Sequence, residues 1–452
     1  MQVEFLLDTP EIRRFAAYLT VAQRPRELSI AEAVLSRDSY GIGAMVSLPT
    51  YEAGSHFPLF TAPSTLPRKY VIPYLCYPYV YFINHEPLVR PLLRIHYTVT
   101  FDTNFASYIN KFVRRESFKG QEDEIIHVID DILYYDLNFD SSFYFVENIK
   151  KAYPIALGMT RDATSSPQKF WELLDGSFRQ NIISLTLFGN VNHQHYLKTR
   201  ELKFDISTEE AIAQSVKFTY WFYVSAEGQE LLKYFLLHQK TILFLLLLIL
   251  KVQFSSREGP RKKIRKFLEL MQEEGMYFDR ETIFAHKYFK DRQTIPILGR
   301  VNRGGAQTGL REKIDNLAWD MTAPRLMERM IALDKLGDYT IPFFLTFDQN
   351  LHELFGCYPV KAVIIDRRSE DVLSIPVLNV GAYFEKEGCG DMITSFFSEE
   401  KKKERFSKEA PTLETLSDRI NNMYRELNAI LSSNSEDSTE DTSSFSHTTG
   451  EG

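Results

Sequence analysis

Strand-like and helix-like patterns alternate in two stretches that lie far apart in the sequence. In the first, alternating and β-branched residues over Leu93–Phe101 lead into Asp102, and Phe105–Val113 then has apolar residues at helical spacing. In the second, an apolar strand over Tyr339–Thr346 precedes a short helix and the strand Ala362–Asp366. Strands that alternate with helices are typical of an α/β fold with a parallel sheet.

Helical patterns fill much of the remaining chain. Glu122–Asp131 opens with acids and has paired apolar positions, and a further helix is expected around Tyr144–Ala152. Lys313–Leu336 is helical apart from an interruption at Pro324, because proline disrupts a helix interior. Since residues 156–309 are also largely helical, the sequence predicts a large helical insertion between the two α/β stretches.

The two ends of the chain differ in character from this core. A helix is expected over Pro10–Ala22, and the prolines of Tyr70–Phe82 favour edge strands or loops. Ser398–Arg405 and Leu413–Leu431 have helical character, and the tail from Ser432 has a composition typical of disorder. The expected segments are an N-terminal region (1–92), the first half of the core (93–155), the helical insertion (156–309), the second half of the core (310–397), C-terminal helices (398–431) and an acidic tail (432–452).

Composition indicates an intracellular globular protein. With 452 residues, 44% of them hydrophobic, the chain can bury a large core. Its three cysteines are far apart and have no CxxC spacing, which argues against a disulfide framework or a zinc ribbon. The apolar run Thr241–Leu250 is shorter than the roughly 20 residues that a bilayer requires, so it is expected to form a buried helix. We therefore expect a cytoplasmic protein with no membrane partner.

The net charge of −7 owes much to the acidic tail, so the rest of the chain is nearly neutral. A neutral average leaves room for a local basic groove. Lys262 and Lys263 lie in the most basic segment, and Arg300 and Arg303 lie in a flexible stretch before the second half of the core. These side chains could contact phosphates. The alternatives are a solvated helix face for the lysines and an ordinary loop for the arginines.

Four acids occupy positions suited to a shared site. Asp102 and Asp348 each follow a predicted strand, and Glu147 and Asp320 lie on helices beside such strands. Open parallel sheets bind ligands beyond the carboxyl ends of their strands. Because Mg²⁺ and Mn²⁺ prefer hard oxygen ligands, converging carboxylates there would form a metal site that offsets charge on a phosphate.

The segments that carry these acids resemble the motifs of the PIN-domain nucleases. VTFDTN, Val99–Asn104, is similar to the first motif, and FYFVEN, Phe143–Asn148, is similar to the second. Asn316–Met330 resembles the third motif, and FFLTFDQNL, Phe343–Leu351, resembles the fourth, in which a strand ends in Thr-x-Asp. This chain departs from the compact family pattern because its large insertion separates the second motif from the third.

The resemblance implies an α/β fold with a PIN-like parallel sheet flanked by helices, and a metal-dependent endonuclease that uses Mg²⁺ or Mn²⁺. The substrate would be RNA, less often DNA, and the biological role that of a toxin or phage-defence effector with an inhibitory or regulatory protein partner. Asp102, Asp320 and Asp348 would be metal ligands, and Glu147 would complete the set or orient the attacking water. Asn104, Asn316 and Thr346 are implied to support the site as hydrogen-bond donors. The candidates for substrate binding from the basic segments remain Lys262, Lys263, Arg300 and Arg303.

The acids also have ordinary structural interpretations, although an exposed position is less natural for Asp320, which follows Trp319 on an otherwise apolar face. Asp102 could cap the helix Phe105–Val113, and Asp348 could cap Asn350–Phe355. Glu147 could be a solvated helix acid, and Asp8 is a rival first acid because it too follows an apolar run. The alternative function is therefore a catalytically inactive PIN-like module that binds a protein or RNA.

Overall fold

The structure, a computed structural model, describes residues 9–36, 39, 41–84, 94–118, 122–159, 166–276, 278–295, 298, 301, 309–333, 338–409 and 411–432. The chain divides into two compact units. The first comprises residues 1–235, 323–349 and 359–377, and the second comprises 236–322, 350–358 and 378–452. These units cut across the segments expected from the sequence, because the helical insertion contributes to both.

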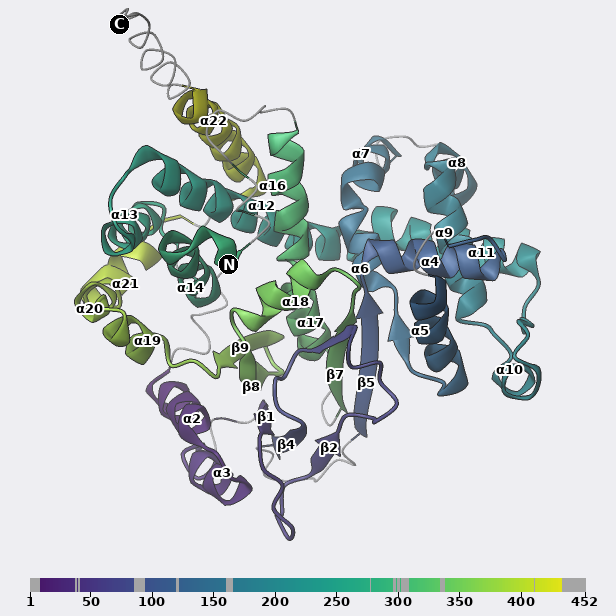
Figure 1. The fold of residues 1–452 in the computed structure, drawn as a ribbon, viewed down its shortest axis with the longest axis horizontal. Coiled ribbons are helices and arrows are strands. Elements are labelled where there is room, and N and C mark those ends of the chain that lie inside the picture. Colours follow the sequence, from purple (N-terminus) through teal and green to yellow (C-terminus); the bar gives the residue numbers. More distant parts are fainter. Residues whose placement is uncertain are drawn as a thin grey trace, which may run out of the picture. The chain divides into compact units, whose positions relative to one another are not determined.

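The fold is α/β, with mixed rather than purely parallel strands (Figure 1). The strands are β1 (Ile42–Leu48), β2 (Leu59–Thr61), β3 (Val71–Pro73), β4 (Tyr79–Asn84), β5 (Arg94–Phe101), β6 (Phe139–Asp140), β7 (Asp338–Leu345), β8 (Val360–Asp366) and β9 (Asp371–Pro376). The helices up to the long α12 are α2 (Pro10–Val21), α3 (Pro25–Glu32), α4 (Thr103–Val113), α5 (Glu122–Tyr134), α6 (Ser142–Glu147), α7 (Ile149–Met159), α8 (Pro167–Leu173), α9 (Gly176–Phe188), α10 (His193–Thr199), α11 (Thr208–Val224) and α12 (Ala226–Ser255). The later helices are α13 (Pro260–Glu273), α14 (Asp279–Lys290), the 3-10 turn η2 (Arg292–Thr294), α16 (Leu310–Asp320), α17 (Ala323–Ala332), α18 (Gln349–Gly356), α19 (Val380–Lys386), α20 (Gly390–Phe396), α21 (Glu399–Phe406) and α22 (Leu413–Ser432).

The sheet that carries the predicted acids has the strand order β3-β7-β5-β6. β5 is parallel to both β7 and β6, as the alternating pattern predicts. Its register against β7 runs from Arg94 opposite Asp338 to Phe101 opposite Leu345, so the carboxyl ends of the two strands are level. β3 is antiparallel to β7, which corrects the expectation of a purely parallel sheet.

A second sheet, β2-β4-β1-β8-β9, is antiparallel throughout. It joins the N-terminal region to the late strands β8 and β9. The expectation of edge strands over Tyr70–Phe82 is right for β3 but wrong for β4, which lies between β2 and β1. Pro73 ends β3 and Pro78 precedes β4, so no proline interrupts the hydrogen bonds of the interior strand.

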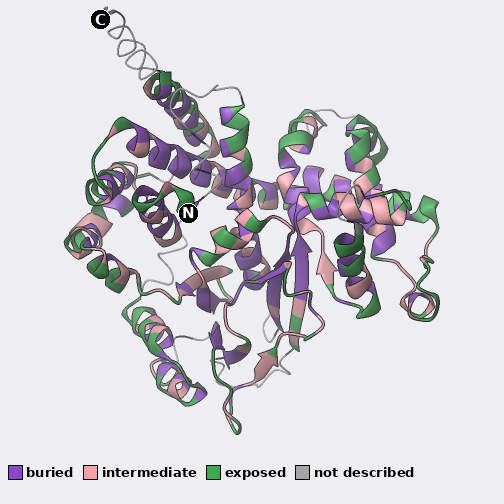
Figure 2. Ribbon diagram, viewed as in Figure 1, coloured by how far each residue is buried: buried purple, intermediate pink, exposed green. Residues whose placement is uncertain are grey.

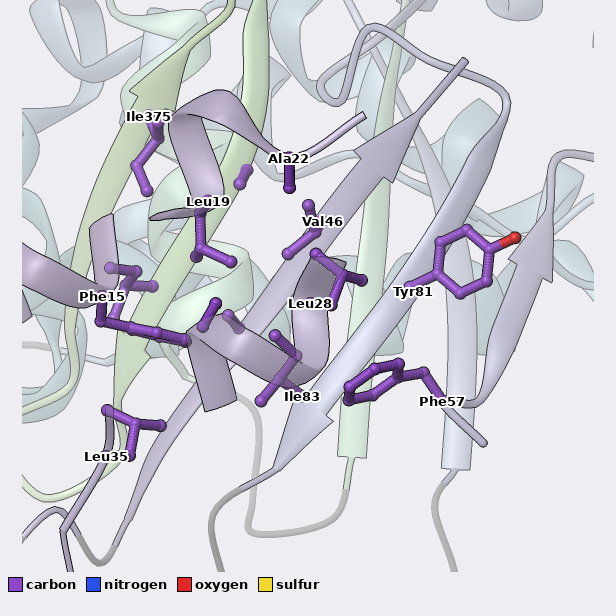
Figure 3. Close-up of a cluster of buried hydrophobic side chains, with 14 of the residues drawn as sticks. Phe15, Leu19, Ala22, Leu28, Leu35, Val46, Phe57, Tyr81, Ile83 and Ile375 are labelled. Atoms are coloured by element: carbon purple, nitrogen blue, oxygen red, sulfur yellow. The ribbon is translucent and has the colours of Figure 1, made fainter. Parts of the chain in front are cut away.

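Helices α2 and α3 cover one face of this second sheet (Figure 3). Thr9 caps α2 by accepting a hydrogen bond from the Ile12 N–H, and Pro10 suits its first turn. Phe15 and Leu19 of α2 are fully buried in the cluster that includes Val46 of β1. Burial of such side chains stabilises each by about 1.5–3 kcal/mol.

The carboxyl end of α2 is tied to β8 by a buried lysine. A bulge in the pairing of β8 with β9 occurs at Lys361. The Lys361 ammonium donates hydrogen bonds of 2.6 and 2.5 Å to the carbonyl oxygens of Thr20 and Ala22, respectively. Carbonyls in the last turn of a helix lack partners within the helix, so Lys361 satisfies two acceptors that would otherwise be buried unpaired.

An aromatic contact links the two sheets. Tyr339 of β7 meets Phe82 of β4 edge to face, with ring centroids 5.0 Å apart. The Tyr339 hydroxyl oxygen would lie 2.8 Å from a Cβ placed on Gly43 of β1. Any larger residue at position 43 would therefore require Tyr339 to shift. The strands on both sides of the contact are buried over most of their length (Figure 2).

Two of the expected helices are each divided into two in the structure, and the other expected helices match closely. The helix expected around Tyr144–Ala152 is divided at Asn148 into α6 and α7. The helix expected over Lys313–Leu336 is divided before Pro324 into α16 and α17, as the proline predicted. Among the described residues of 156–309, helices predominate.

The apolar run Thr241–Leu250 lies within α12, and all of its residues are buried as expected. Among the described residues, α12 is the one helix with the length and composition to cross a membrane, and 72% of its apolar window is buried in the protein. The C-terminal helix expected over Leu413–Leu431 is α22, and the expected tail lies outside the described residues.

Candidate functional site

Asp102 and Thr346 occupy equivalent positions at the ends of β5 and β7. Each follows the last residue of its strand, and those residues, Phe101 and Leu345, lie opposite one another. The Thr346 hydroxyl donates a 2.7 Å hydrogen bond to Oδ2 of Asp102. Both side chains are buried, so the bond joins the two strand ends in a site with little water.

Asp102 also caps helix α4. Its Oδ1 accepts a 2.7 Å hydrogen bond from the backbone N–H of Phe105, so each carboxylate oxygen already has a donor. The capping interpretation of this acid is therefore correct. It does not conflict with a chemical role, because a carboxylate has about four lone-pair sites for donors or a cation.

Asp348 is connected to Asp102 through the same threonine. Its backbone N–H donates a 3.0 Å hydrogen bond to the Thr346 hydroxyl oxygen, and its side chain is half-buried. The carboxylate is near enough to Asp102 for its charge to raise the pKa of that acid. The Thr-x-Asp segment thus brings two carboxylates together at the end of adjacent strands.

Glu147, the last residue of α6, approaches the same place from a helix. It accepts a hydrogen bond from the hydroxyl of Thr103, the first residue of α4. Burial raises its pKa, and the positive charges of Lys150 and Lys151 partly offset this effect. Glu147 is therefore neither a fully solvated helix acid nor fully enclosed.

The Asp102 carboxyl group lies within electrostatic reach of two other carboxylates. Burial raises the pKa of Asp102 to about 6, although the hydrogen bonds from Thr346 and Phe105 act in the opposite direction. Repulsion from Glu147 and Asp348 adds to the rise. Perturbed carboxyl groups of this kind are common at functional sites.

Sequence reasoning missed a fourth acid at this edge of the sheet. Asp140 ends β6 and pairs in register with Thr100 of β5. It accepts hydrogen bonds of 2.9 and 2.8 Å from the backbone N–H and hydroxyl of Ser142, and desolvation raises its pKa. β6 has only two residues, too few for a periodic pattern, and the signal was an acid followed by serines before a helix.

The predicted acid Asp320 belongs to the second unit, whereas Asp102, Glu147 and Asp348 belong to the first. It is the last residue of α16 and is half-buried. Asn316 lies on the same helix and is exposed, and Asn104 is exposed on the first turn of α4. Within the first unit, the structure places Asp102, Glu147 and Asp348 near one another, with Thr346 between two of them.

The basic residues expected to bind substrate differ in availability. Lys262 is exposed and pairs with Glu258 at 2.8 Å. Lys263 is mostly buried and donates to Gln253 at 3.0 Å, so its interpretation as a phosphate contact is corrected. It faces the core because its position on α13 follows the apolar stripe of that helix. Arg300 and Arg303 lie outside the described residues.

Within the part of the chain that the structure describes, no three Asp, Glu, His or Cys side chains are already arranged to hold one metal ion. Comparison with family profiles, with curated proteins and with solved structures found no match.

Proposed function

We propose that this protein is a metal-dependent phosphodiesterase that cleaves RNA, with Asp102, Glu147 and Asp348 as its acids. The observation that carries the proposal is the position of Asp102 and Asp348 just beyond the level carboxyl ends of the parallel strands β5 and β7, where open α/β sheets bind ligands, with Glu147 near Asp102. A PIN-like core is the finer proposal. It is supported by the adjacent parallel strands β7, β5 and β6, each of which ends in or is soon followed by an aspartate.

The chemistry of the side chains fits Mg²⁺ or Mn²⁺, because all three supply the hard oxygen donors that these cations prefer. Mg²⁺ is commonly held by one or two carboxylates together with water and substrate phosphates, so a complete protein cage is not required. Asp102 and Asp348 would hold the cation, with Glu147 beside them. Bound there, it would offset the charge that develops on the scissile phosphate.

The chain's own residues orient this site. Thr346 holds Asp102 through its hydroxyl proton and holds the backbone of Asp348 through its hydroxyl oxygen. The hydroxyl of Thr103, at the start of α4, donates a hydrogen bond to the carboxylate of Glu147. These hydrogen bonds orient the carboxylates of Asp102 and Glu147 and fix the backbone that carries Asp348.

The proposal is tested with the full chain and a labelled RNA pool in Mn²⁺ or EDTA. Asp348→Asn should lower the cleavage rate by about 100-fold. The matched control is Asp136→Asn, because the Asp136 side chain is 76% exposed and belongs to the loop before β6. Cleavage that persists in EDTA, or that Asp348→Asn leaves unchanged, would contradict the proposed mechanism.

A catalytically inactive binding module is the second candidate. It is favoured by the two hydrogen bonds that already occupy the Asp102 carboxylate and give it a structural purpose. RNA binding by the wild-type protein without metal-dependent cleavage in the same assay would support this candidate.

A further inference from the structure

A stripe of basic side chains runs along the exposed face of α13. Its members, all exposed, lie just before the helix or on its first two turns: Arg257, Arg261, Lys262, Arg265 and Lys266. The opposite face of the helix, with Ile264 and Phe267, is buried in the core. Glu269, one turn further on, ends the stripe. The bases of this stripe therefore face solvent and take no part in the packing of the helix.

The position of these bases on the helix is electrostatically costly. The amino end of a helix favours acids, because its unpaired N–H groups give it a partial positive charge. The first turn of α13 instead carries Arg261 and Lys262, and Arg265 and Lys266 follow four residues later. Like charges at this spacing repel one another. An anionic partner on this face would relieve the repulsion.

Neighbouring acids offset only part of the charge. Arg261 pairs with Asp391 at 3.3 Å and Lys262 pairs with Glu258 at 2.8 Å, and every side chain in these two pairs is at least 49% exposed. Solvated pairs of this kind are weak, so the bases can exchange one acid for another. The stripe thus keeps an excess of positive charge that a segment with several acids can neutralise.

The acidic tail (432–452) has the complementary charge pattern. It contains five acids and no Lys or Arg. Glu436 and Asp437 are adjacent, and Glu440 and Asp441 follow four residues later. The stripe has the same spacing in its two basic pairs, 261–262 and 265–266. The tail therefore offers one carboxylate for each of these four bases.

The tail begins within reach of the stripe. Glu426 of α22 pairs with Lys251 of α12 at 2.6 Å, and Arg257 follows Lys251 by six residues. Helix α22 ends at Ser432, which lies roughly 9 Å beyond Glu426 at the rise of an α-helix. The 20 residues after Ser432 can span up to about 65 Å. Since all of these described residues belong to the second unit, the tail is long enough to cover the stripe.

We propose that the acidic tail binds to the basic stripe of α13 in the same chain, with its paired acids on the paired bases. A segment tethered close to its binding site has an effective concentration of about a millimolar, so weak individual contacts suffice. The contact keeps other polyanions off the stripe until they displace the tail. It is independent of the proposed function, because Asp102 and its neighbouring acids belong to the other unit.

Zero-length cross-linking tests for direct contact. A carbodiimide activates a carboxyl group, which then forms an amide with a touching lysine while the carbodiimide takes up the water. In the full wild-type chain, we expect mass spectrometry to find tail peptides joined to Lys262 or Lys266. The pair of Glu258 with Lys262 is an internal positive control. The amide-tail variant, a full chain in which the four paired acids of the tail become Gln or Asn, should lose most of the tail cross-links.

Peptide competition measures the affinity of the stripe. A labelled peptide with the sequence of residues 432–452 is titrated with full-length protein at low salt, and fluorescence anisotropy reports binding. The amide-tail variant should bind the peptide about tenfold more tightly than the wild type does, because the wild-type tail already occupies the stripe. Adding Arg265→Gln and Lys266→Gln to the amide-tail variant should weaken binding about tenfold. The matched control adds Lys198→Gln and Lys203→Gln, at two exposed lysines of the first unit, and should leave binding unchanged.

Several results would overturn this inference. Absence of tail cross-links in a sample where Glu258 is joined to Lys262 would show that the tail does not lie on the stripe. Tail cross-links that form only between chains with different isotope labels would assign the stripe to the tail of a second copy. Equal peptide affinity of the wild type and the amide-tail variant would contradict competition within one chain. A stripe that binds labelled RNA but not the peptide would be a nucleic-acid surface instead.

Discussion

The hydroxyl of Thr346 donates to Oδ2 of Asp102 at 2.7 Å and thereby joins the ends of two parallel strands. The same oxygen accepts the N–H of Asp348. The Thr346 side chain thus orients the carboxylate of Asp102 and the backbone of Asp348, so its removal should affect stability as well as the geometry of the site.

Replacing Thr346 by valine keeps the side-chain shape and deletes both hydrogen bonds. The buried Asp102 carboxylate would lose a donor, and we expect the free energy of unfolding to fall by about 1–3 kcal/mol. Urea denaturation at pH 8 measures this change. Thr346→Ser, which keeps the hydroxyl, should recover most of the lost stability, and equal midpoints for the valine variant and wild type would show that the bond contributes little.

The raised pKa of Asp102 predicts that the free energy of unfolding falls as the pH rises. Burial raises this pKa from 3.8 to about 6, so folding favours the protonated carboxyl. The stability contributed by this group is complete below the unfolded pKa and is lost as the pH rises through 6. The Asp102→Asn side chain cannot ionise and does not lose this stability. The unfolding free energy of the variant, relative to that of the wild type, should therefore rise by up to about 3 kcal/mol from pH 4 to pH 8.

Urea denaturation of wild type and Asp102→Asn at both pH values measures this difference. Asp136→Asn removes a charge from an exposed side chain and controls for the change in net charge. A stability difference between wild type and Asp102→Asn that is the same at pH 4 and pH 8 would contradict the assignment of a raised pKa.

Replacing Lys361 by methionine should release the end of α2. The substitution leaves the carbonyl oxygens of Thr20 and Ala22 without their buried donor, and we expect a loss of about 1–3 kcal/mol. Hydrogen exchange should quicken in α2 before other helices of the first unit. Lys401→Met, which breaks an exposed pair with Glu404, is the control and should change stability by less than about 1 kcal/mol.

Local patterns predicted individual elements well. The alternation before Asp102 and the apolar run before Asp348 identified β5 and β7, because residues that face a core repeat with the period of their own backbone. The capping interpretation of Asp102 is also correct, since a short polar side chain before a helix can accept a hydrogen bond from the unpaired N–H groups of the first turn.

Long-range relations were not accessible to such reasoning. Nothing near β1 indicates that it pairs with β8, or that β4 lies inside a sheet, because strand pairing depends on segments far away in the chain. Lys263 looked like part of a basic surface in the sequence, yet its place on the apolar stripe of α13 buries it.

By itself, the sequence determined the α/β class, most helices and strands, and the acids that follow the central strands. Only the tertiary structure decided that Glu147 and Asp348 lie within electrostatic reach of Asp102, that Asp140 ends a strand at the same sheet edge, and that Asp320 belongs to the other unit. The physical reason is that periodicity records which face of an element is buried, whereas a site depends on which elements pack together.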